Sequence, residues 1–357
     1  MAFNLAKCDF CGDCLDLCKY TPYDRTSGAD QIRRLVRGED AEIVTECVTC
    51  AACNAYCSKG ANPFDLVLQR QEKSGLYRTT PSYFKLVESI DQSPGEIQRG
   101  EPGRPVFNLC AVDVIPGLFE GELFEGCTFL RGGAYESLLA WIHVGRESPL
   151  RKTLQRKVDA LAATGYTEIV MFHDDCYAAY TTKALEYGID VPFRVVHYVE
   201  YLRDALRQRR SRLKKPLGWK IAYQQPCSSR YTPWMDRCLD ELFDLAGVER
   251  VARTYDRLNA LCCGCTVSPH LGHEAGESYK ARNIRDALDH GARAMVFMCP
   301  FCALQMREEA AQAGLEPIFL TNLARMALGE KLSAHPAGLG DDRDPIAAAV
   351  RIVKGLL

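Results

Sequence analysis

Short apolar runs alternate with predicted helices along the last two thirds of the chain. Four runs have the length of buried strands: Glu168–Phe172, Phe193–Val196, Ala294–Met298 and Pro317–Leu320. Helix start signals and stop glycines bound two of the intervening stretches: Ser148-Pro149 with Gly165, and Thr232-Pro233 with Gly247. Alternating strands and helices predict α/β units, with a parallel or mixed sheet and helices on its faces. In such a sheet the loops that follow the strands gather at one edge, where ligands bind.

The first 92 residues follow a different pattern, which predicts helices. One helix is expected over Asp30–Arg37, and others start at Asn62-Pro63 and Thr80-Pro81. Segment 93–105 is polar and rich in proline and glycine, which predicts a linker. The expected organisation is therefore a helical module over 1–92, the linker 93–105, two units over 106–215 and 216–332, and a C-terminal tail helix within 333–357.

The units 106–215 and 216–332 can be laid over one another. Residues 124–129 (Phe-Glu-Gly-Cys-Thr-Phe) match 262–267 (Cys-Cys-Gly-Cys-Thr-Val), and 168–176 match 294–302. Each unit then continues into a helix, a turn with glycine and another short apolar strand. The chain is therefore expected to contain a duplicated α/β unit.

Composition changes this picture in one respect, the cysteine content. A chain of 357 residues with 47% hydrophobic and 25% charged residues is ordinary for a globular protein, but 18 cysteines are not. The chain is long and opens on Met1-Ala2-Phe3 without a signal peptide, so a cytoplasmic location with metal-bound thiolates is favoured over a disulfide scaffold. The net charge of -2 gives no electrostatic indication of nucleic-acid binding. No apolar run is long enough for a membrane span, so any membrane association would require a partner.

Eight cysteines near the N-terminus form two copies of C-x2-C-x2-C-x3-C. The copies are Cys8, Cys11, Cys14, Cys18 and Cys47, Cys50, Cys53, Cys57. Zinc sites use close pairs of cysteines and would leave the third of each triplet unexplained. The spacing resembles two-cluster ferredoxins, which implies one 4Fe-4S cubane on Cys8, Cys11, Cys14 and Cys57 and another on Cys47, Cys50, Cys53 and Cys18. Lys19 and Ser58 stand where that motif usually has proline.

A second set of cysteines is spread over the last unit. Cys227 is followed by the pair Cys262-Cys263 and then by Cys299 and Cys302, with 228–261 and 264–298 between them. Buried cysteine as a small apolar residue explains neither a vicinal pair nor a C-x-x-C. Cys227 and Cys299 directly follow predicted strands, so the five sulfurs are expected to meet at one sheet edge as a metal site.

These motifs resemble the heterodisulfide reductase family, namely its D subunit or fused C and B subunits. The resemblance implies a helical ferredoxin-like module followed by two CCG cysteine-rich domains. It also implies a non-cubane 4Fe-4S cluster held by Cys227, Cys262, Cys263, Cys299 and Cys302. The first unit departs from the motif, because Phe124 and Glu125 align with the vicinal cysteines and His173 with the first cysteine of C-x-x-C. The expected pocket therefore has Phe124, Glu125, His173 and Asp174 as its second wall.

The remnant in the first unit leaves two interpretations open. Cys110, His173, Asp174 and Cys176 have side chains that suit zinc. A purely structural remnant is the alternative, and Cys127 is expected in the core. Asp174 and Asp175 are candidate proton donors to a thiolate leaving group.

Three functions remain open at this point. The first is an iron-sulfur oxidoreductase subunit that exchanges electrons with a partner and acts on a thiol, a disulfide or a sulfur-carrier protein at the non-cubane cluster. The second is a pure electron-transfer subunit, as in respiratory dehydrogenase or benzoyl-CoA reductase complexes, and the third is a metal-stabilised scaffold or redox sensor. The chain has no dinucleotide fingerprint or P-loop, so a flavin-containing partner is expected.

Overall fold

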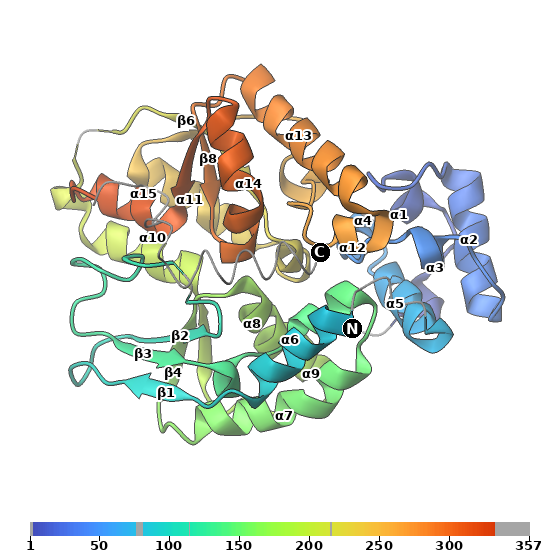
Figure 1. Ribbon diagram of the computed structural model, residues 1–357, viewed down its shortest axis with the longest axis horizontal. Helices are drawn as coiled ribbons and strands as arrows, with labels where there is room; N and C mark the ends of the chain where they lie inside the picture. Colours follow the sequence, from blue (N-terminus) through green and yellow to red (C-terminus); the bar gives the residue numbers. More distant parts are fainter. Residues whose placement is uncertain (1–2, 76–80, 114, 215, 333–357) are drawn as a thin grey trace.

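The computed structural model describes residues 3–75, 81–113, 115–214 and 216–332. Figure 1 shows a group of helices followed by two sheets, each with its own helices. Mixed helices and parallel strands confirm the α/β prediction. The expected tail helix within 333–357 lies outside the described residues.

The N-terminal group consists of short helices around a small core of its own. The elements are η1 (Leu5–Lys7), α1 (Asp13–Asp16), α2 (Arg25–Arg37), α3 (Ile43–Glu46), α4 (Ala52–Tyr56) and α5 (Pro63–Ser74). Helix α2 begins earlier than predicted because Asp24 and Ser27 form a capping box, and it ends at Gly38 with φ of 83°. The predicted start of α5 at Pro63 is confirmed. Leu15, Ile32 and Leu35 are buried in this core.

The first sheet has five strands in the order β1-β3-β2-β4-β5. They are β1 (Glu96–Gln98), β2 (Val106–Cys110), β3 (Thr128–Arg131), β4 (Glu168–Met171) and β5 (Arg194–His197). All neighbours are parallel except β1, which pairs antiparallel with β3. The segment 93–105, expected as a linker, thus supplies an edge strand. Its residues are exposed or half-buried, so it lacks the apolar signal of an inner strand.

Helices of this first unit surround its sheet. They are α6 (Pro81–Gln92), α7 (Ser148–Ala162), α8 (Asp174–Ala178), α9 (Ala184–Glu186) and α10 (Tyr198–Gln208). The helical turns are η2 (Gly133–Tyr135), η3 (Leu139–Val144), the π-helical turn η4 (Ala179–Lys183) and η5 (Arg210–Arg212). The described residues between β2 and β3 form turns and no helix.

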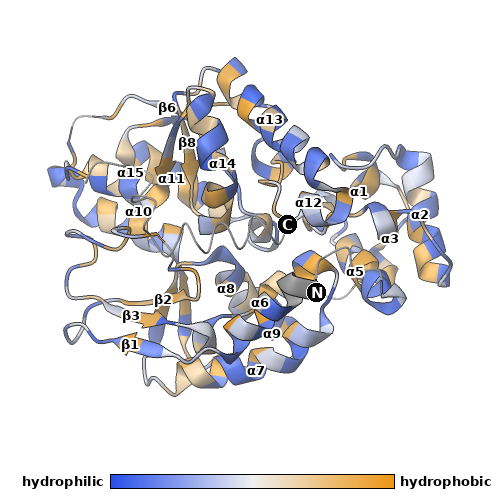
Figure 2. Cartoon of the chain, viewed as in Figure 1, coloured by the Kyte–Doolittle hydropathy of each residue, from blue (hydrophilic) through white to orange (hydrophobic). Residues whose placement is uncertain are grey.

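The second sheet has four parallel strands in the order β7-β6-β8-β9. They are β6 (Lys220–Gln224), β7 (Glu249–Arg250), β8 (Ala294–Phe297) and β9 (Glu316–Phe319). The accompanying helices are η6 (Cys227–Tyr231), α11 (Met235–Ala246), η7 (Arg257–Asn259), α12 (Val267–Leu271), α13 (His273–Asp289), α14 (Pro300–Gln312) and α15 (Leu320–Ala327). Strands β6 and β8 are mostly hydrophobic, whereas the outer helices α2 and α13 carry both kinds of residue (Figure 2).

The two sheets place corresponding strands in the same order. Strands β3-β2-β4-β5 of the first sheet occupy the positions of β7-β6-β8-β9 in the second. Parallel strands end at a common edge, so the loops after β2, β3 and β4 converge, as do those after β6, β7 and β8. Helices α10 and α11 pack against one another where the units meet.

A buried ion-pair network joins the N-terminal helices to the first unit. The Nζ of Lys183 lies 2.8 Å from Asp65 in α5, 3.4 Å from Glu147 and 3.0 Å from Glu186. The Lys183 side chain is 0% exposed. Among the helices that the structure describes, none combines the length and the apolar character that crossing a bilayer requires.

Candidate metal centre

A cavity of about 310 Å³ lies between the two α/β units. Its lining from the second unit includes Cys265 and four of the five motif cysteines: Cys227, Cys263, Cys299 and Cys302. The first unit contributes Glu136, His143, His173, Asp174 and Asp175, together with apolar side chains. The strand-end edges of both sheets therefore face one hollow, as the parallel topology requires.

The five cysteines of the second unit come together from three loops. Cys227 follows β6, Cys262 and Cys263 follow β7, and Cys299 precedes α14, whose first turn holds Cys302. Their thiols are in contact in the order Cys227, Cys262, Cys263, Cys302 and Cys299. The structure thus brings together the sulfurs that the spacing placed in one site.

The five sulfurs of this site differ in how readily they ionise. The hydrogen bond from Cys302 and the proximity of His173 lower the pKa of the Cys299 thiol to about 6, although burial opposes this. Cys262 Sγ accepts hydrogen bonds from Thr266 Oγ1 at 3.0 Å and Thr266 N at 3.5 Å. All 18 cysteines are free thiols, so no disulfide uses these sulfurs. The pKa values of the other four thiols are raised by their mutual contacts and by burial. Five buried cysteine sulfurs in contact are the ligand set of a soft metal or an iron-sulfur cluster.

The N-terminal cysteines form two further groups. Cys8, Cys11, Cys14 and Cys57 line one small cavity, and Cys18, Cys47, Cys50 and Cys53 line another. Each group takes three cysteines from one copy of the motif and the last cysteine from the other. Backbone N–H groups of Tyr20, Thr49 and Ala61 donate to Cys18, Cys47 and Cys57 at 3.5, 3.4 and 3.4 Å. Such N–H···S bonds are among the features that set the potential of a cluster.

Two side chains connect the Cys18 group to the five cysteines. The backbone N–H of Cys262 donates to Tyr20 Oη at 2.6 Å. Arg230 is 6% exposed and donates to the carbonyl of Ala260 at 2.6 Å. Burial opposes the charge of this guanidinium, but the nearby thiols of Cys50 and Cys227 raise its pKa. Arg230 is therefore a buried cation between two groups of cysteines.

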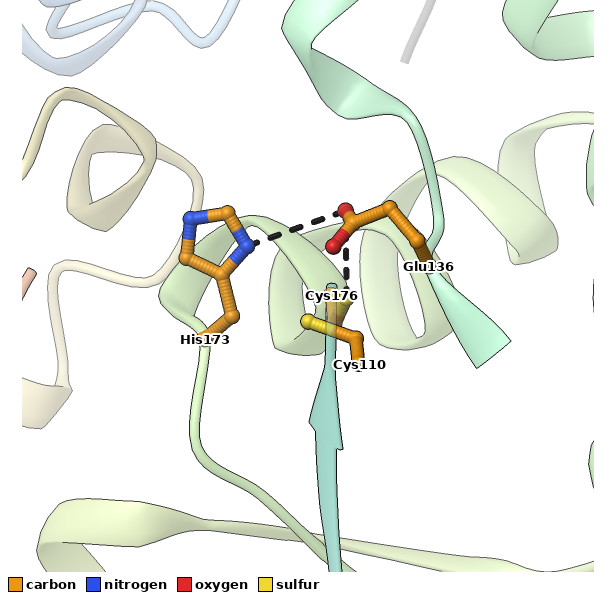
Figure 3. A group of neighbouring side chains, drawn as sticks. All are labelled: Cys110, Glu136, His173 and Cys176. Carbon is orange, nitrogen blue, oxygen red and sulfur yellow. Dashed lines mark hydrogen bonds and ion pairs between the residues drawn. The ribbon is translucent and has the colours of Figure 1, made fainter. Parts of the chain in front are cut away.

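A different set of ligand types gathers at the corresponding edge of the first sheet. The ligand atoms of Cys110, Glu136, His173 and Cys176 all lie within 4.8 Å of one another, and all four residues are buried (Figure 3). Asp174 takes another role: its carboxylate bonds His197 Nε2 at 2.8 Å and accepts from Ser228 Oγ at 2.8 Å. The zinc hypothesis named Asp174 as a fourth ligand, and the structure puts Glu136 in that place.

Phe124 and Glu125 do not line the cavity. Phe124 packs in the core against Phe107 and Phe119, and the Glu125 carbonyl accepts from Arg104. These residues precede β3, whereas Cys262 and Cys263 follow β7, the strand in the matching position. The alignment of 124–129 with 262–267 was therefore wrong, and the loop after β3, which holds Glu136, is the counterpart. Cys127 is buried in the core, as expected.

Two histidines beside Asp175 face the cavity. His143 Nε2 lies 3.9 Å from Asp175 Oδ1, and His173 Nε2 lies 3.8 Å from Asp175 Oδ2. Burial disfavours the charged form of His143, but the Asp175 carboxylate raises its pKa. Burial would raise the pKa of Asp175, yet both histidines lower it, so this carboxyl stays ionised. Asp175 is consequently better suited to hold a proton on histidine than to donate one.

Comparison with known proteins agrees with the cysteine pattern. Residues 221–307 match the family described as CCG, cysteine-rich domain. The chain contains a CCG domain. The matched range includes all five cysteines of the second unit.

Several proteins resemble the chain beyond this domain. The D subunit of dihydromethanophenazine:CoB–CoM heterodisulfide reductase from Methanosarcina acetivorans is 25% identical over 184 residues, which is 50% of this chain and 45% of that protein. The B subunit of fumarate reductase (CoM/CoB) from Methanothermobacter marburgensis is 22% identical over 329 residues, 83% of this chain and 63% of the relative. These matches confirm the resemblance to heterodisulfide reductase-like iron-sulfur proteins. The matched stretches span less than two thirds of each relative.

A solved structure supports the fold. A hypothetical protein from Helicobacter pylori aligns with a TM-score of 0.54 and 12% identity, covering 88% of this chain and 71% of that one. The CCG domain and the unit before it are thus part of an architecture found in another protein, although at this identity the likeness concerns the fold alone.

Sequence patterns missed four residues at or near the cavity: Tyr20, Glu136, His143 and Arg230. The fold brings Tyr20, Glu136 and His143 there from other loops, whereas Arg230 lies in η6, three residues after Cys227, where an arginine alone signals no function. The sequence around Glu136 carries no metal-binding motif.

Proposed function

We propose that this protein is an iron-sulfur oxidoreductase subunit that moves electrons through two 4Fe-4S cubanes to or from a non-cubane 4Fe-4S cluster acting on a thiol or disulfide. The observation that carries this proposal is the cavity of about 310 Å³ with four of the five CCG cysteines in its wall. A site that only relayed electrons would need no hollow beside its ligands.

The donor sets fit the groups proposed. Cys8, Cys11, Cys14 and Cys57 would hold one cubane, and Cys18, Cys47, Cys50 and Cys53 the other. Cys227, Cys262, Cys263, Cys299 and Cys302 would hold the non-cubane cluster. When bound there, an iron-sulfur cluster supplies one-electron chemistry that cysteine side chains alone cannot provide to a substrate sulfur.

The chain's own residues have two tasks in this reaction. Reduction of a disulfide to two thiols takes up two electrons and two protons, so the cavity must deliver protons as well as electrons. His143 lines the cavity, and the Asp175 carboxylate favours its protonated form. Val112, Leu138 and Val144 give the hollow an apolar wall that favours the carbon skeleton of a thiol over water.

Partner proteins complete the proposal. The two relatives are named as subunits of larger reductases, and a flavin-containing partner would exchange electrons with the cubanes. Such a partner would also provide any contact with a membrane, and the reaction would take place in the cytoplasm. The Cys8 group is the natural entry point, because the Cys18 group is the one that Tyr20 connects to the CCG cysteines.

A pure electron-transfer role is the second candidate. The loss of the cysteine motif in the first unit agrees with this role, because a second cluster facing the cavity is then absent.

Low-temperature EPR on anaerobically purified protein separates the two candidates. Adding a panel of thiols and disulfides should shift the signal that disappears in Cys263→Ser and leave the cubane signals unchanged. His143→Gln should keep this shift but slow the turnover of a disulfide, by about 100-fold if it is the proton donor. A CCG-domain signal that no thiol or disulfide perturbs would favour the pure relay.

A further inference from the structure

The first unit contains a buried cluster that the proposed redox function does not use. Its residues come from three loops at the strand-end edge: Cys110 ends β2, Glu136 follows η2 after β3, and His173 and Cys176 flank the start of α8 after β4. These positions correspond to the three loops that carry cysteines in the CCG domain. The first unit therefore presents two sulfurs, one ring nitrogen and one carboxylate where the CCG domain presents five sulfurs.

The side chains point toward a common centre. Figure 3 shows the Glu136 carboxylate directed at the His173 ring on one side, with Cys110 and Cys176 below it in this view. Cys176 Sγ donates to Glu136 Oε1 at 3.6 Å, and His173 Nδ1 lies 3.7 Å from the same oxygen, which is too far for a hydrogen bond. A spacing of this size between ligand atoms is what a small ion at their centre requires, since Zn–S, Zn–N and Zn–O bonds are each about 2.0–2.3 Å.

Two atoms of the cluster have no partner in the structure. Glu136 Oε2 and His173 Nδ1 are buried without a hydrogen bond, and their residues are 5% and 4% exposed. A buried polar atom without a hydrogen-bond partner destabilises the folded state, and more so when it is charged. Both atoms face the cluster, so one ion at its centre would satisfy both.

Charge leads to the same conclusion. A buried carboxylate beside two cysteines is unfavourable unless a cation compensates it. Among the described residues, no lysine or arginine lies within ion-pair distance of the Glu136 carboxylate. Its neighbours are Cys110, Cys176, the backbone N–H of Leu138 and His173, and His173 is the one of these that can carry a positive charge. On its outer side, His173 directs Nε2 at the Asp175 carboxylate, which is the arrangement that orients a metal-binding histidine.

We propose that Cys110, Glu136, His173 and Cys176 bind a zinc ion. Four buried protein ligands of mixed S, N and O type suit tetrahedral Zn²⁺, and a closed set leaves no position for substrate. Zinc has no redox chemistry. This site therefore fixes the wall of the cavity opposite the CCG cysteines, since Glu136 and His173 belong to that wall.

Asn108 holds two parts of the site together. Its Nδ2 donates to the Tyr135 carbonyl at 2.9 Å, and its Oδ1 accepts from the Cys110 backbone at 3.0 Å. Cys110 has a left-handed φ of 46°, which costs energy in a residue other than glycine. The Asn108 bonds thus maintain the loop conformation that presents Cys110 and Glu136 to one ion.

Metal analysis of the full-length protein, purified anaerobically with its iron, tests the site. Wild type should contain one zinc per chain, and Cys176→Ser should lose it while retaining its iron. Cys127→Ser is the matched control, because Cys127 is a buried cysteine of the same unit outside the cluster. It should retain both metals.

Glu136→Gln keeps the side-chain size and guards against misfolding of the cysteine variant. It should bind zinc about ten-fold more weakly or worse in chelator competition, with the iron-sulfur absorption unchanged. Wild type without zinc after anaerobic incubation with zinc and desalting would overturn the proposal. Loss of iron from Cys176→Ser would also overturn it, because the residues would then belong to an iron site. Neither result bears on whether thiols perturb the CCG cluster.

Discussion

The two α/β units share a strand order but differ in what their strand-end loops carry. In the CCG domain three loops bring five sulfurs together, whereas in the first unit the corresponding loops bring two sulfurs, an imidazole and a carboxylate. The fold thus determines where ligands converge, and the loop residues determine which metal they suit. On the proposals above, the CCG side of the cavity would carry out electron transfer, and the zinc site on the other side would hold the cavity wall in place.

Replacing a cysteine of the CCG domain should have the largest effect on the protein's metal content. It tests whether the five cysteines of that domain bind an iron-sulfur cluster. Cys263 contacts both Cys262 and Cys302, so Cys263→Ser breaks the chain of sulfurs at its middle. We expect loss of about four of roughly twelve irons and of one EPR signal set, with the cubane signals intact. Iron assay and EPR on the same sample measure this. If the iron content does not change, the five-cysteine site holds no cluster.

The buried lysines of the two units provide a stability comparison. Lys183→Met leaves three carboxylates without their cation, and two of them, Asp65 and Glu186, are only 4% and 5% exposed. The substitution should therefore lower the free energy of unfolding by about 3–5 kcal/mol. Lys280 of the second unit pairs with Glu277 and Glu309, which are 42% and 33% exposed and can turn to water. Lys280→Met should therefore cost about 1 kcal/mol. Anaerobic urea denaturation compares them, and equal losses would refute the stabilising role assigned to the Lys183 network.

Arg230 allows the electrostatics of the CCG side to be tested. Removing a buried cation near Cys50 and Cys227 favours the oxidised, less negative state of the neighbouring clusters. Arg230→Gln should lower their reduction potentials by tens of millivolts, on the order expected from Coulomb's law in a partly screened site. An EPR-monitored redox titration measures the shift. Arg257→Gln serves as the control, because Arg257 is exposed. An equal shift of the reduction potentials in both variants would show that Arg230 has no specific effect on the clusters.

The smallest effect is expected at Phe124, which tests the corrected alignment of the two units. Phe124 is 3% exposed and packs in the core of the first unit, away from the cavity. Phe124→Leu should cost less than about 1.5 kcal/mol and leave the metal content and the EPR spectrum unchanged. If Phe124→Leu changed the EPR spectrum but not the free energy of unfolding, Phe124 would belong to the cavity wall and the corrected alignment would be wrong.

Much of the fold could be predicted from sequence because its signals are local. The apolar runs gave β4, β5, β8 and β9 to within about two residues, and the strand-end rule placed Cys227 and Cys299 correctly. Cysteine spacing anticipated the three groups of sulfurs that the structure brings together. The short edge strand β1 was missed because its exposed residues carry no apolar alternation.

The candidate site in the first unit was harder to predict for a physical reason. Residues 126–128 and 264–266 share the letters Gly-Cys-Thr, which suggested an alignment that the strand order contradicts. Glu136 and Cys110 are 26 positions apart in the sequence. They meet only because β2 and β3 are neighbours in the sheet. Pairing of this kind depends on topology, so no spacing rule between Glu136 and a cysteine could reveal it.

One fold, on this view, carries an iron-sulfur site in its CCG domain and a zinc site in its first unit. The most direct measurement is the iron and zinc content of the wild-type protein, purified without oxygen and quantified per chain on one sample. We predict roughly twelve irons and one zinc. About sixteen irons with no zinc would show that the first unit also holds a cluster, and a colourless, zinc-loaded protein without iron would contradict both assignments.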